Sequence, residues 1–281
     1  MTEANHAERT RPQRAEDQRD ILDIVGLTVA LPGRTGTGTT VLHGVDLRLK
    51  PGGIHGLAGE SGSGKTMTGL AVMGLLPPGA RARGRVLLDG EDLLSLSAHE
   101  LGAVRGRVVS MVFQDPSTCL HPMLTIGHQL TDHLRHHLKI GRKEARGRAA
   151  DLLGRVRIPS PAEALSRYPH EFSGGMRQRV AIAAALACEP KVVIADEPTT
   201  GLDVTIQAGV LRLLRGLCDE LGLAILLVTH DLGVMSAIAD EVSVLKHGRV
   251  VESGPRARVL TAPRHGYTRS LLEALPGRTA T

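Results

Sequence analysis

Short apolar runs recur along the chain and predict strands that alternate with helices. Four of these runs have little polar interruption: Ile54–Ala58, Val108–Phe113, Lys191–Ala195 and Ala224–Thr229. Runs of this length are typical of strands that are buried on both faces of a parallel sheet. The pattern therefore favours the α/β class of fold.

A second kind of strand pattern lies in the first third of the chain. Val45, Leu47 and Leu49 alternate with polar residues, which predicts a strand with one face in water. Further strands are expected at Ile21–Leu31 and Gly84–Leu88. The Gly- and Thr-rich stretch Pro32–Thr40, with Gly36-Thr37-Gly38, is interpreted as a hairpin loop. We therefore expect an antiparallel set of strands beside the parallel sheet.

Helical periodicity dominates the middle of the chain. In Thr125–Arg157 apolar residues recur at spacings of four, and a short helix is expected in Ser160–Tyr168 before Pro169. The sequence predicts a helical insertion over Pro116–Tyr168. The apolar residues that set this spacing are Ile126, Leu130, Leu134 and Leu138.

Length and composition limit the possible classes of protein. The 281 residues suffice for one large domain with an inserted subdomain. No apolar run approaches the ~18–20 residues that span a bilayer, and residues 1–20 lack the apolar segment of a signal peptide. We expect residues 1–20 to be a disordered tail and the chain to be cytoplasmic. The three cysteines form no CxxC pair, which indicates reduced thiols.

The net charge of +5 is spread along the chain, which contains no Trp and only four Phe or Tyr residues. Binding of nucleic acid usually needs clustered cations, and single strands also need aromatic stacking platforms. A basic solvated surface is therefore the better interpretation, and we expect no nucleic-acid partner.

A complete G-x-x-x-x-G-K-T phosphate loop follows the first buried strand and precedes an expected helix that ends near Leu75. This order of strand, glycine loop and helix is the one that the motif requires. Its backbone N–H groups can surround a polyphosphate at the positive end of the helix, while Lys65 reaches the β- and γ-phosphates and Thr66 binds Mg²⁺. The sequence therefore predicts a site for a nucleoside triphosphate, in Gly59-Glu60-Ser61-Gly62-Ser63-Gly64-Lys65-Thr66.

Two other polar groups allow more than one interpretation. Gln114 ends a predicted strand and faces the ligand crevice, where it completes the Mg²⁺ shell or holds the attacking water; position alone does not separate it from a surface Gln before a turn. His133, His136 and His137 have the i, i+3, i+4 spacing of a possible metal site. A solvated polar helix face is the interpretation that we favour for these histidines.

Ser173-Gly174-Gly175 begins another expected helix, which runs to Cys188. Ser173 is a good N-cap, and the glycines expose N–H groups at the helix start. Arg177 and Arg179 in the first turns oppose the helix dipole, and a bound anion would relieve that conflict. The segment is therefore a second candidate phosphate site.

Two adjacent carboxylates, Asp196 and Glu197, end the buried strand at Lys191–Ala195. Successive strand residues point in opposite directions, so we expect different roles for them. Asp196 is suited to hold Mg²⁺, and Glu197 to act as the general base on the attacking water. His230 follows the next strand, where it can contact the γ-phosphate.

Together these motifs resemble those of the ATP-binding subunits of ABC transporters. The residues within and around them are most similar to the dipeptide, oligopeptide and nickel branch of that family. The resemblance covers about Ile21 to Pro276, and His265-Gly266-Tyr267-Thr268-Arg269 is similar to the closing element of that branch. The other segments that carry it are Phe113-Gln114-Asp115-Pro116, Ser173-Gly174-Gly175-Met176-Arg177-Gln178-Arg179, Ala195-Asp196-Glu197-Pro198-Thr199-Thr200-Gly201-Leu202-Asp203-Val204-Thr205 and Thr229-His230-Asp231-Leu232-Gly233-Val234.

The resemblance implies a P-loop NTPase core of RecA-like mixed sheet, with an antiparallel β subdomain and a helical subdomain over about 116–190. The cassette would span 21–276, followed by a short tail at 277–281. It implies ATP hydrolysis with Mg²⁺ held by Thr66, Gln114 and Asp196. Lys65, Glu197 and His230 would be catalytic, and Gln114 would also contact ATP.

The resemblance also implies partners. Ser173, Gly174, Gly175 and Met176 would contact ATP bound to a second cassette, across an interface that includes Asp203. Two transmembrane permease subunits and, indirectly, an extracytoplasmic substrate-binding protein would complete an importer of peptides or of nickel and metal chelates. The chain would lie peripherally on the cytoplasmic face of the membrane. Both a homodimer and a heterodimer of ATPases fit the sequence.

The sequence departs from the family pattern at three places, and two other functions are considered. Val29-Ala30-Leu31 stands where an aromatic residue usually stacks on adenine, Leu120-His121-Pro122 replaces Leu-Asn-Pro, and a longer Cys-bearing tail is missing. A soluble ABC ATPase that acts on nucleic acid or ribosomes is the alternative, but the second cassette or long coiled coil typical of those proteins is not found. A regulatory subunit without turnover is disfavoured by the intact site residues.

Overall fold

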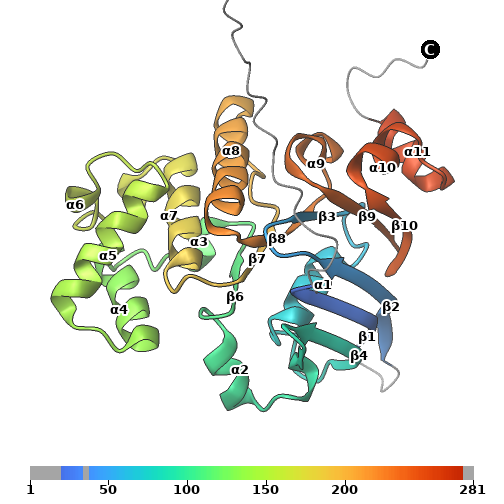
Figure 1. Ribbon diagram of the computed structural model, residues 1–281, viewed down its shortest axis with the longest axis horizontal. Coiled ribbons are helices and arrows are strands. Elements are labelled where there is room, and N and C mark those ends of the chain that lie inside the picture. The colour runs from blue at the N-terminus through green and yellow to red at the C-terminus, as the bar shows by residue number, and fades with distance from the viewer. Residues whose placement is uncertain (1–19, 34–37, 275–281) are drawn as a thin grey trace, which may run out of the picture.

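The structure, a computed structural model, describes residues 20–33 and 38–274. The tails that we expected at 1–20 and 277–281 lie outside the described residues, apart from Asp20, as do Gly36 and Thr37 of the expected hairpin loop. Within the described part, two sheets lie beside each other and helices surround them (Figure 1).

The larger sheet has six strands in the order β10-β9-β3-β8-β7-β6. Pairing is parallel from β9 through β6, and β10 pairs antiparallel with β9 at one edge. All four predicted buried strands are present. The bounds are β3 (Ile54–Ala58), β6 (Val109–Val112), β7 (Val192–Asp196), β8 (Ala224–Thr229), β9 (Glu241–Lys246) and β10 (Arg249–Pro255).

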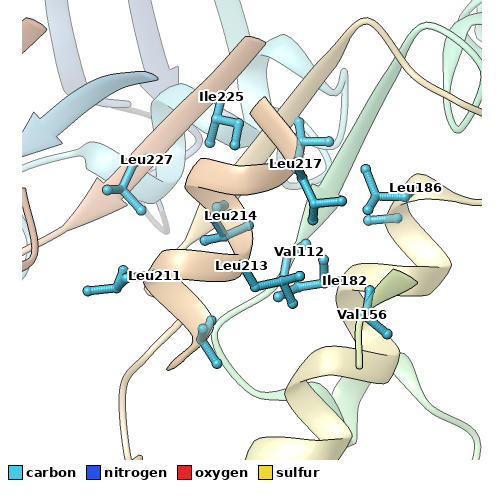
Figure 2. Close-up of a cluster of buried hydrophobic side chains, with 14 of the residues drawn as sticks. Val112, Val156, Ile182, Leu186, Leu211, Leu213, Leu214, Leu217, Ile225 and Leu227 are labelled. Atoms are coloured by element: carbon cyan, nitrogen blue, oxygen red, sulfur yellow. The ribbon is translucent and has the colours of Figure 1, made fainter. Parts of the chain in front are cut away.

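Strands β3, β6, β7 and β8 are buried along their whole length, which is why they contain few polar residues, whereas β9 and β10 at one side of the sheet carry more of them. In β7, Val192 and Ile194 pack in the core beneath the smaller sheet, whereas Val193 packs in the helical core on the other face. Figure 2 shows that helical core, where leucines of α8 (Val204–Leu221) lie against Ile225 and Leu227 of β8.

The smaller sheet is antiparallel, with the order β2-β1-β4-β5. Val45, Leu47 and Leu49 are buried and the polar residues between them are exposed, as their alternation predicted. One strand begins at Arg81 instead of the expected Gly84, which lies inside it so close to the Gly26 backbone that no Cβ would fit. The bounds are β1 (Leu22–Leu31), β2 (Thr39–Leu49), β4 (Arg81–Leu88) and β5 (Glu91–Asp92).

The chain between β6 and β7 contains only helices among its regular elements. The helical periodicity expected over 125–157 is present as two helices, because Lys139 ends the first helix at φ 56° and Gly141 is the N-cap of the next. In Figure 1 the first helices of this segment form a lobe that projects away from the smaller sheet. The bounds are α3 (Pro116–Cys119), α4 (Ile126–Leu138), α5 (Arg142–Arg155), α6 (Pro161–Ala164), a 3₁₀ helix (Pro169–Glu171) and α7 (Gly174–Leu186).

The other helices cover the sheets or follow their strands. Among the described residues, no helix combines the length and apolar character needed to cross a membrane. The bounds are α1 (Lys65–Val72), a 3₁₀ helix (Leu93–Ser95), α2 (Ala98–Val104), α9 (Leu232–Ile238), α10 (Arg256–Thr261) and α11 (Gly266–Glu273).

Candidate active site

The predicted site residues meet where the parallel strands end. The carboxyl ends of β3, β7 and β8 lead into the phosphate loop, the two carboxylates and His230, and β6 leads towards Gln114. This edge of an open α/β sheet is the usual place for a ligand. A cavity of about 570 Å³ lies here, lined by Val41, Gly59, Glu60, Ser61, Gly62, Gly64, Lys65, Thr66, Met67, Gln114, Glu197, His230 and Leu271.

The phosphate loop has a backbone that only glycine can adopt without strain. Gly59 and Gly64 have φ of 152° and 108°, and a Cβ on Gly64 would lie 2.5 Å from Leu42 Cδ2. Ser63 contributes a buried hydroxyl that has no hydrogen-bond partner within the described chain. A tight loop with an unsatisfied buried donor at the start of α1 fits a polyphosphate ligand.

Lys65 lies in the floor of the cavity, where its side chain is buried. Its Nζ donates to the carbonyl oxygens of Gly59 at 2.7 Å and Glu60 at 2.9 Å. Burial lowers the pKa of Lys65, and the nearby Glu197, Asp196 and Glu60 oppose that shift. The ammonium group is therefore a cation with little hydration at the place where phosphate oxygens would bind.

Each of the three candidate magnesium ligands carries a side-chain oxygen, and two of them, Thr66 and Gln114, line the cavity. Thr66 Oγ1 donates to Asp196 Oδ1 at 3.1 Å, which brings a hydroxyl and a buried carboxylate together. Burial raises the pKa of Asp196, Glu197 raises it further, and the hydrogen bond from Thr66 and the charge of Lys65 act against both. Gln114 lines the same cavity. A hydroxyl, a carboxylate and an amide fit the oxygen preference of Mg²⁺.

Glu197 and His230 form a close pair at the edge of the cavity. His230 Nδ1 lies 2.7 Å from Glu197 Oε1, and the His230 backbone N–H donates to the same oxygen at 3.1 Å. Thr200 donates to Glu197 Oε2 at 2.9 Å. These bonds hold both oxygens of the Glu197 carboxylate in place at the edge of the cavity.

Our reason for separating the two carboxylates was wrong, although their partners do differ. We expected strand alternation to direct them apart, but β7 ends at Asp196, and Glu197 follows at φ 49°. The left-handed backbone conformation of Glu197 turns its side chain towards His230. A non-glycine residue held in that region is a common feature of functional sites.

The Ser-Gly-Gly segment lies outside this cavity and packs against α8. Ser173 is the N-cap of α7, and its Oγ accepts the Met176 N–H at 3.3 Å, as expected. Gly175 is buried against Ile206, and a Cβ there would lie under 3.0 Å from that side chain. Asp203 caps α8 by accepting the Ile206 N–H at 2.9 Å. These residues form a second cluster, separate from the chain's own phosphate loop.

The histidine cluster on α4 is not a metal site by its geometry. No group of three or more His, Cys, Asp or Glu residues in the described chain is arranged to hold a metal ion. The three rings instead pack edge to edge, with centroids 4.7 and 4.9 Å apart. Burial, with the neighbouring His137 and His136, lowers the pKa of His133 to about 4. The face is therefore less solvated than we expected.

Sequence reasoning missed the apolar side of the cavity and its connection to the C-terminal helix. Val41, Met67 and Leu271 supply apolar side chains to the lining. The Tyr267 hydroxyl accepts the backbone N–H of Glu60 at 3.2 Å. Tyr267 belongs to a segment that we noted only for its family resemblance, and no periodicity places a residue 207 positions away against Glu60.

A glycine cradle, a buried lysine and two carboxylates at the strand ends define a phosphate-loop nucleotide-binding protein. Comparison with known proteins narrows this class. Residues 42–200 match the ABC transporter family. The chain belongs to this family and is an ATP-binding, ATP-hydrolysing subunit of an ABC transporter, so the expected fold class is confirmed.

Similar curated proteins include the probable D,D-dipeptide transport ATP-binding protein DdpD of Escherichia coli, 48% identical over 91% of this chain and 78% of the relative. The dipeptide transport ATP-binding protein DppD of Bacillus subtilis is 45% identical over 91% of this chain and 77% of the relative.

Solved structures agree with this assignment. The ATP-binding cassette MJ0796, in a dimeric post-hydrolysis state with ADP and phosphate, is 29% identical at a TM-score of 0.73, over 84% of this chain and 98% of that one. The cassette cbiO1 of Clostridium perfringens is also 29% identical, at a TM-score of 0.72 over 90% of this chain and all of that one.

Proposed function

We propose that the chain hydrolyses ATP to drive import of peptides, or of nickel or another metal as a chelate. The observation that carries the proposal is that Lys65, Thr66, Glu197 and His230 line one cavity, with Asp196 hydrogen-bonded to Thr66 beside it. The cargo is argued from the relatives, which are named for dipeptide transport. Those names do not favour the alternative function on nucleic acid or ribosomes.

In this proposal each group around the cavity has one task. Loop N–H groups and Lys65 bind the phosphates, as the two carbonyl bonds of Lys65 are exchanged for phosphate oxygens. Thr66, Gln114 and Asp196 hold Mg²⁺, which neutralises phosphate charge when bound. Glu197 takes the proton of the attacking water.

His230 orients the Glu197 carboxylate in this scheme. Its ring nitrogen and its backbone N–H both bind Oε1, which leaves Oε2 to the hydroxyls of Thr200 and Thr229. The ring of His230 is 60% exposed, whereas the Glu197 side chain is 11% exposed. An exposed imidazole on a buried carboxylate can turn towards a γ-phosphate without disturbing the core.

The Ser-Gly-Gly segment and Asp203 serve the ATP of a second cassette. Support comes from their position, because Ser173, Gly174, Gly175, Met176 and Asp203 do not line the chain's own cavity. Beside Asp203, Val204 is 80% exposed, as expected of an apolar residue that a partner covers. The second cassette is a copy of this chain or a related ATPase.

The permease subunits dock beside Gln114, on the helical subdomain over about 116–190. Support comes from an apolar groove of about 300 Å³ between β6, α4 and α7. Phe113, next to Gln114, lines this groove, so a helix seated there would be coupled to the nucleotide cavity. The assembled importer has two permeases and meets an extracytoplasmic binding protein indirectly. The chain then lies on the cytoplasmic face of the membrane.

Besides Phe113, the residues that line the apolar groove include Met73, Leu75, Leu120, Ile126, Leu130 and Val180.

Turnover of Mg-ATP by the purified chain tests the proposal. Glu197→Gln should still bind ATP and should lose turnover by about 10²-fold or more, because general-base catalysis contributes ~10²–10⁴. Glu189→Gln is the matched control, since Glu189 is an exposed glutamate that also has a positive φ, 53° against 49°. Turnover that rises more steeply than protein concentration indicates self-pairing.

Three outcomes contradict parts of the proposal. Full turnover by Glu197→Gln removes the assigned base. Tight ATP binding without turnover by the wild-type chain, alone and with its permeases, favours a regulatory subunit. In the assembled transporter, stimulation by nickel and not by peptides would exclude peptide import.

A further inference from the structure

Helix α11 lies against the phosphate loop, although more than 200 residues separate them in the chain. The Tyr267 side chain is buried and its hydroxyl accepts the Glu60 N–H at 3.2 Å. One turn further along the helix, Leu271 lines the nucleotide cavity. Figure 1 shows α11 at the C-terminal side, next to α10. The same helix therefore contacts both the loop and the space beside it.

The helix is fixed to the sheet by a buried carboxylate. Glu252 of β10 accepts the backbone N–H groups of Arg264 at 2.9 Å and His265 at 3.1 Å. The ring of His265 in turn accepts the Tyr267 N–H at 3.2 Å and caps the helix. Arg258 balances the charge of Glu252 at 3.6 Å. A buried anchor of this kind makes the position of Tyr267 well determined.

The Tyr267 ring is held from another side as well. The Lys246 ammonium at the end of β9 lies over the ring, 4.4 Å from its centroid. Burial raises the pKa of Tyr267, so the phenol keeps its proton across the physiological range. The hydroxyl is thus a neutral, fixed acceptor for the loop.

One peptide unit connects Tyr267 to the catalytic lysine. The Glu60 N–H and the Gly59 carbonyl belong to the same peptide bond, whose plane is rigid. Tyr267 holds its N–H end, and Lys65 holds its carbonyl end at 2.7 Å. When Lys65 exchanges this carbonyl for phosphate, the Tyr267 bond continues to hold the peptide in its orientation.

The apolar lining of the cavity also involves α11. Ala30 and Leu31, in the segment where the family resemblance implies an aromatic residue, line a different cavity together with Thr28. The nucleotide cavity instead has Val41 from β2, Met67 from α1 and Leu271 from α11. An aliphatic wall of this kind suits the flat face of a nucleoside base.

We infer that α11 is a nucleotide-binding element, in which Tyr267 positions the phosphate loop through Glu60 and Leu271 contacts the nucleoside of ATP. The inference rests on the proposed ATP site. It assigns two residues separate tasks, one towards the phosphates and one towards the base. Inorganic tripolyphosphate, which has phosphates and no nucleoside, distinguishes them.

The composition of the chain allows a direct binding measurement. The chain has no Trp and only two tyrosines, Tyr168 and Tyr267. Tyr168→Phe leaves Tyr267 as the single tyrosine fluorophore, and Tyr267→Phe leaves Tyr168, which stacks on His170 at 5.7 Å. We expect both Mg-ATP and Mg-tripolyphosphate to change the emission of the first protein and to leave that of the second unchanged.

Binding constants measured by calorimetry complete the test. Tyr267→Phe should weaken ATP and tripolyphosphate equally, by about 2- to 10-fold for one hydrogen bond, and should raise KM with little change in kcat. Leu271→Ala should weaken ATP about 3- to 10-fold for the lost apolar contact and leave tripolyphosphate unchanged. Tyr168→Phe and Leu221→Ala, at a 44% exposed leucine on α8, are the controls.

Results opposite to these expectations contradict separate parts of the inference. Unchanged binding by Tyr267→Phe, at wild-type thermal stability, contradicts the positioning role. Equal losses for both ligands in Leu271→Ala contradict the nucleoside contact. If the wild-type chain binds ATP and Glu197→Gln abolishes turnover, the proposed function stands whatever α11 does. If the wild-type chain binds neither ligand, both the function and this inference are wrong.

Discussion

Gly175 offers a sharp test of how the Ser-Gly-Gly segment is built. A Cβ at this position would lie under 3.0 Å from Ile206 Cγ2, a branch close to the backbone of α8 that cannot swing away freely. Overpacking of this kind costs about 1–3 kcal/mol. The opposing gain, from replacing a helical glycine by alanine, is ~0.5–1 kcal/mol. We therefore expect Gly175→Ala to lower the free energy of unfolding by about 1–2 kcal/mol.

The neighbouring glycine is a matched control. At Gly174 the nearest atom to an added Cβ is Leu202 Cδ2 at 3.7 Å, an ordinary contact. Gly174→Ala should be neutral or slightly stabilising, because only the helix-propensity gain acts there. Both variants have the same change in chemistry at adjacent residues of α7, so the difference between them isolates the contact with Ile206.

Urea unfolding with and without Ile206→Ala measures the effect. The second substitution removes the atom that the new Cβ meets, so the penalty of Gly175→Ala should largely disappear in the double variant, with a coupling energy of ~1 kcal/mol or more. Equal stabilities of the Gly174 and Gly175 variants, or a penalty that persists without Ile206 Cγ2, would refute the packing argument.

Three further predictions concern the magnesium ligand, the anchor of α11 and the thiols. Thr66→Val should raise the Mg²⁺ concentration needed for half-maximal ATP turnover roughly tenfold, as seen in a Mg²⁺ titration; an unchanged requirement would remove Thr66 from the site. Burial raises the pKa of Glu252, but the backbone hydrogen bonds from Arg264 and His265 and the charge of Arg258 outweigh it, so the pKa is lowered. The stabilising effect of the Glu252 carboxylate is therefore complete above the unfolded pKa of about 4.3 and is lost as pH falls through the folded pKa. Glu252→Gln should reduce the loss of unfolding free energy between neutral and acid pH, measured by urea unfolding. An unchanged pH dependence of stability would contradict the role of Glu252 in fixing α11. Cys119 is exposed, whereas Cys188 and Cys218 are buried with raised pKa values, so a thiol reagent should modify one group fast and two slowly, and Cys119→Ser should abolish the fast phase.

The sequence was sufficient for features that depend on local pattern. The buried strands, the phosphate loop before α1 and the Ser173 cap all follow from residues within a few positions of each other. The break at Lys139 did not, because lysine is a good helix former and rarely adopts the left-handed conformation that it has here. Only the observed left-handed backbone, stabilised by packing of α5 on α4, separates the two helices.

Local sequence patterns did not predict the contacts between segments that are distant in the chain. The Glu197 turn depends on a hydrogen bond from its N–H to the Val228 carbonyl on the neighbouring strand, at 2.8 Å. Tyr267 meets Glu60 because α10 and α11 pack back over the sheet. Neither relation leaves a periodic signal, since each joins one residue to one other and side-chain periodicity reports only which face is buried.

The order of strands in the larger sheet has a consequence for synthesis on the ribosome. Strand β3, which leads into the phosphate loop, is hydrogen-bonded on its two sides to β8 and β9, and these strands begin at residues 224 and 241. While the chain emerges, both edges of β3 stay unpaired until β8 has been made, which ends at residue 229, whereas β3 ends at residue 58. Pairings this far apart form slowly, and unpaired edges of apolar strands invite aggregation. The nascent chain is therefore most prone to aggregation before its last quarter has been synthesised. Binding of chaperones to the nascent chain would reduce aggregation most during that interval.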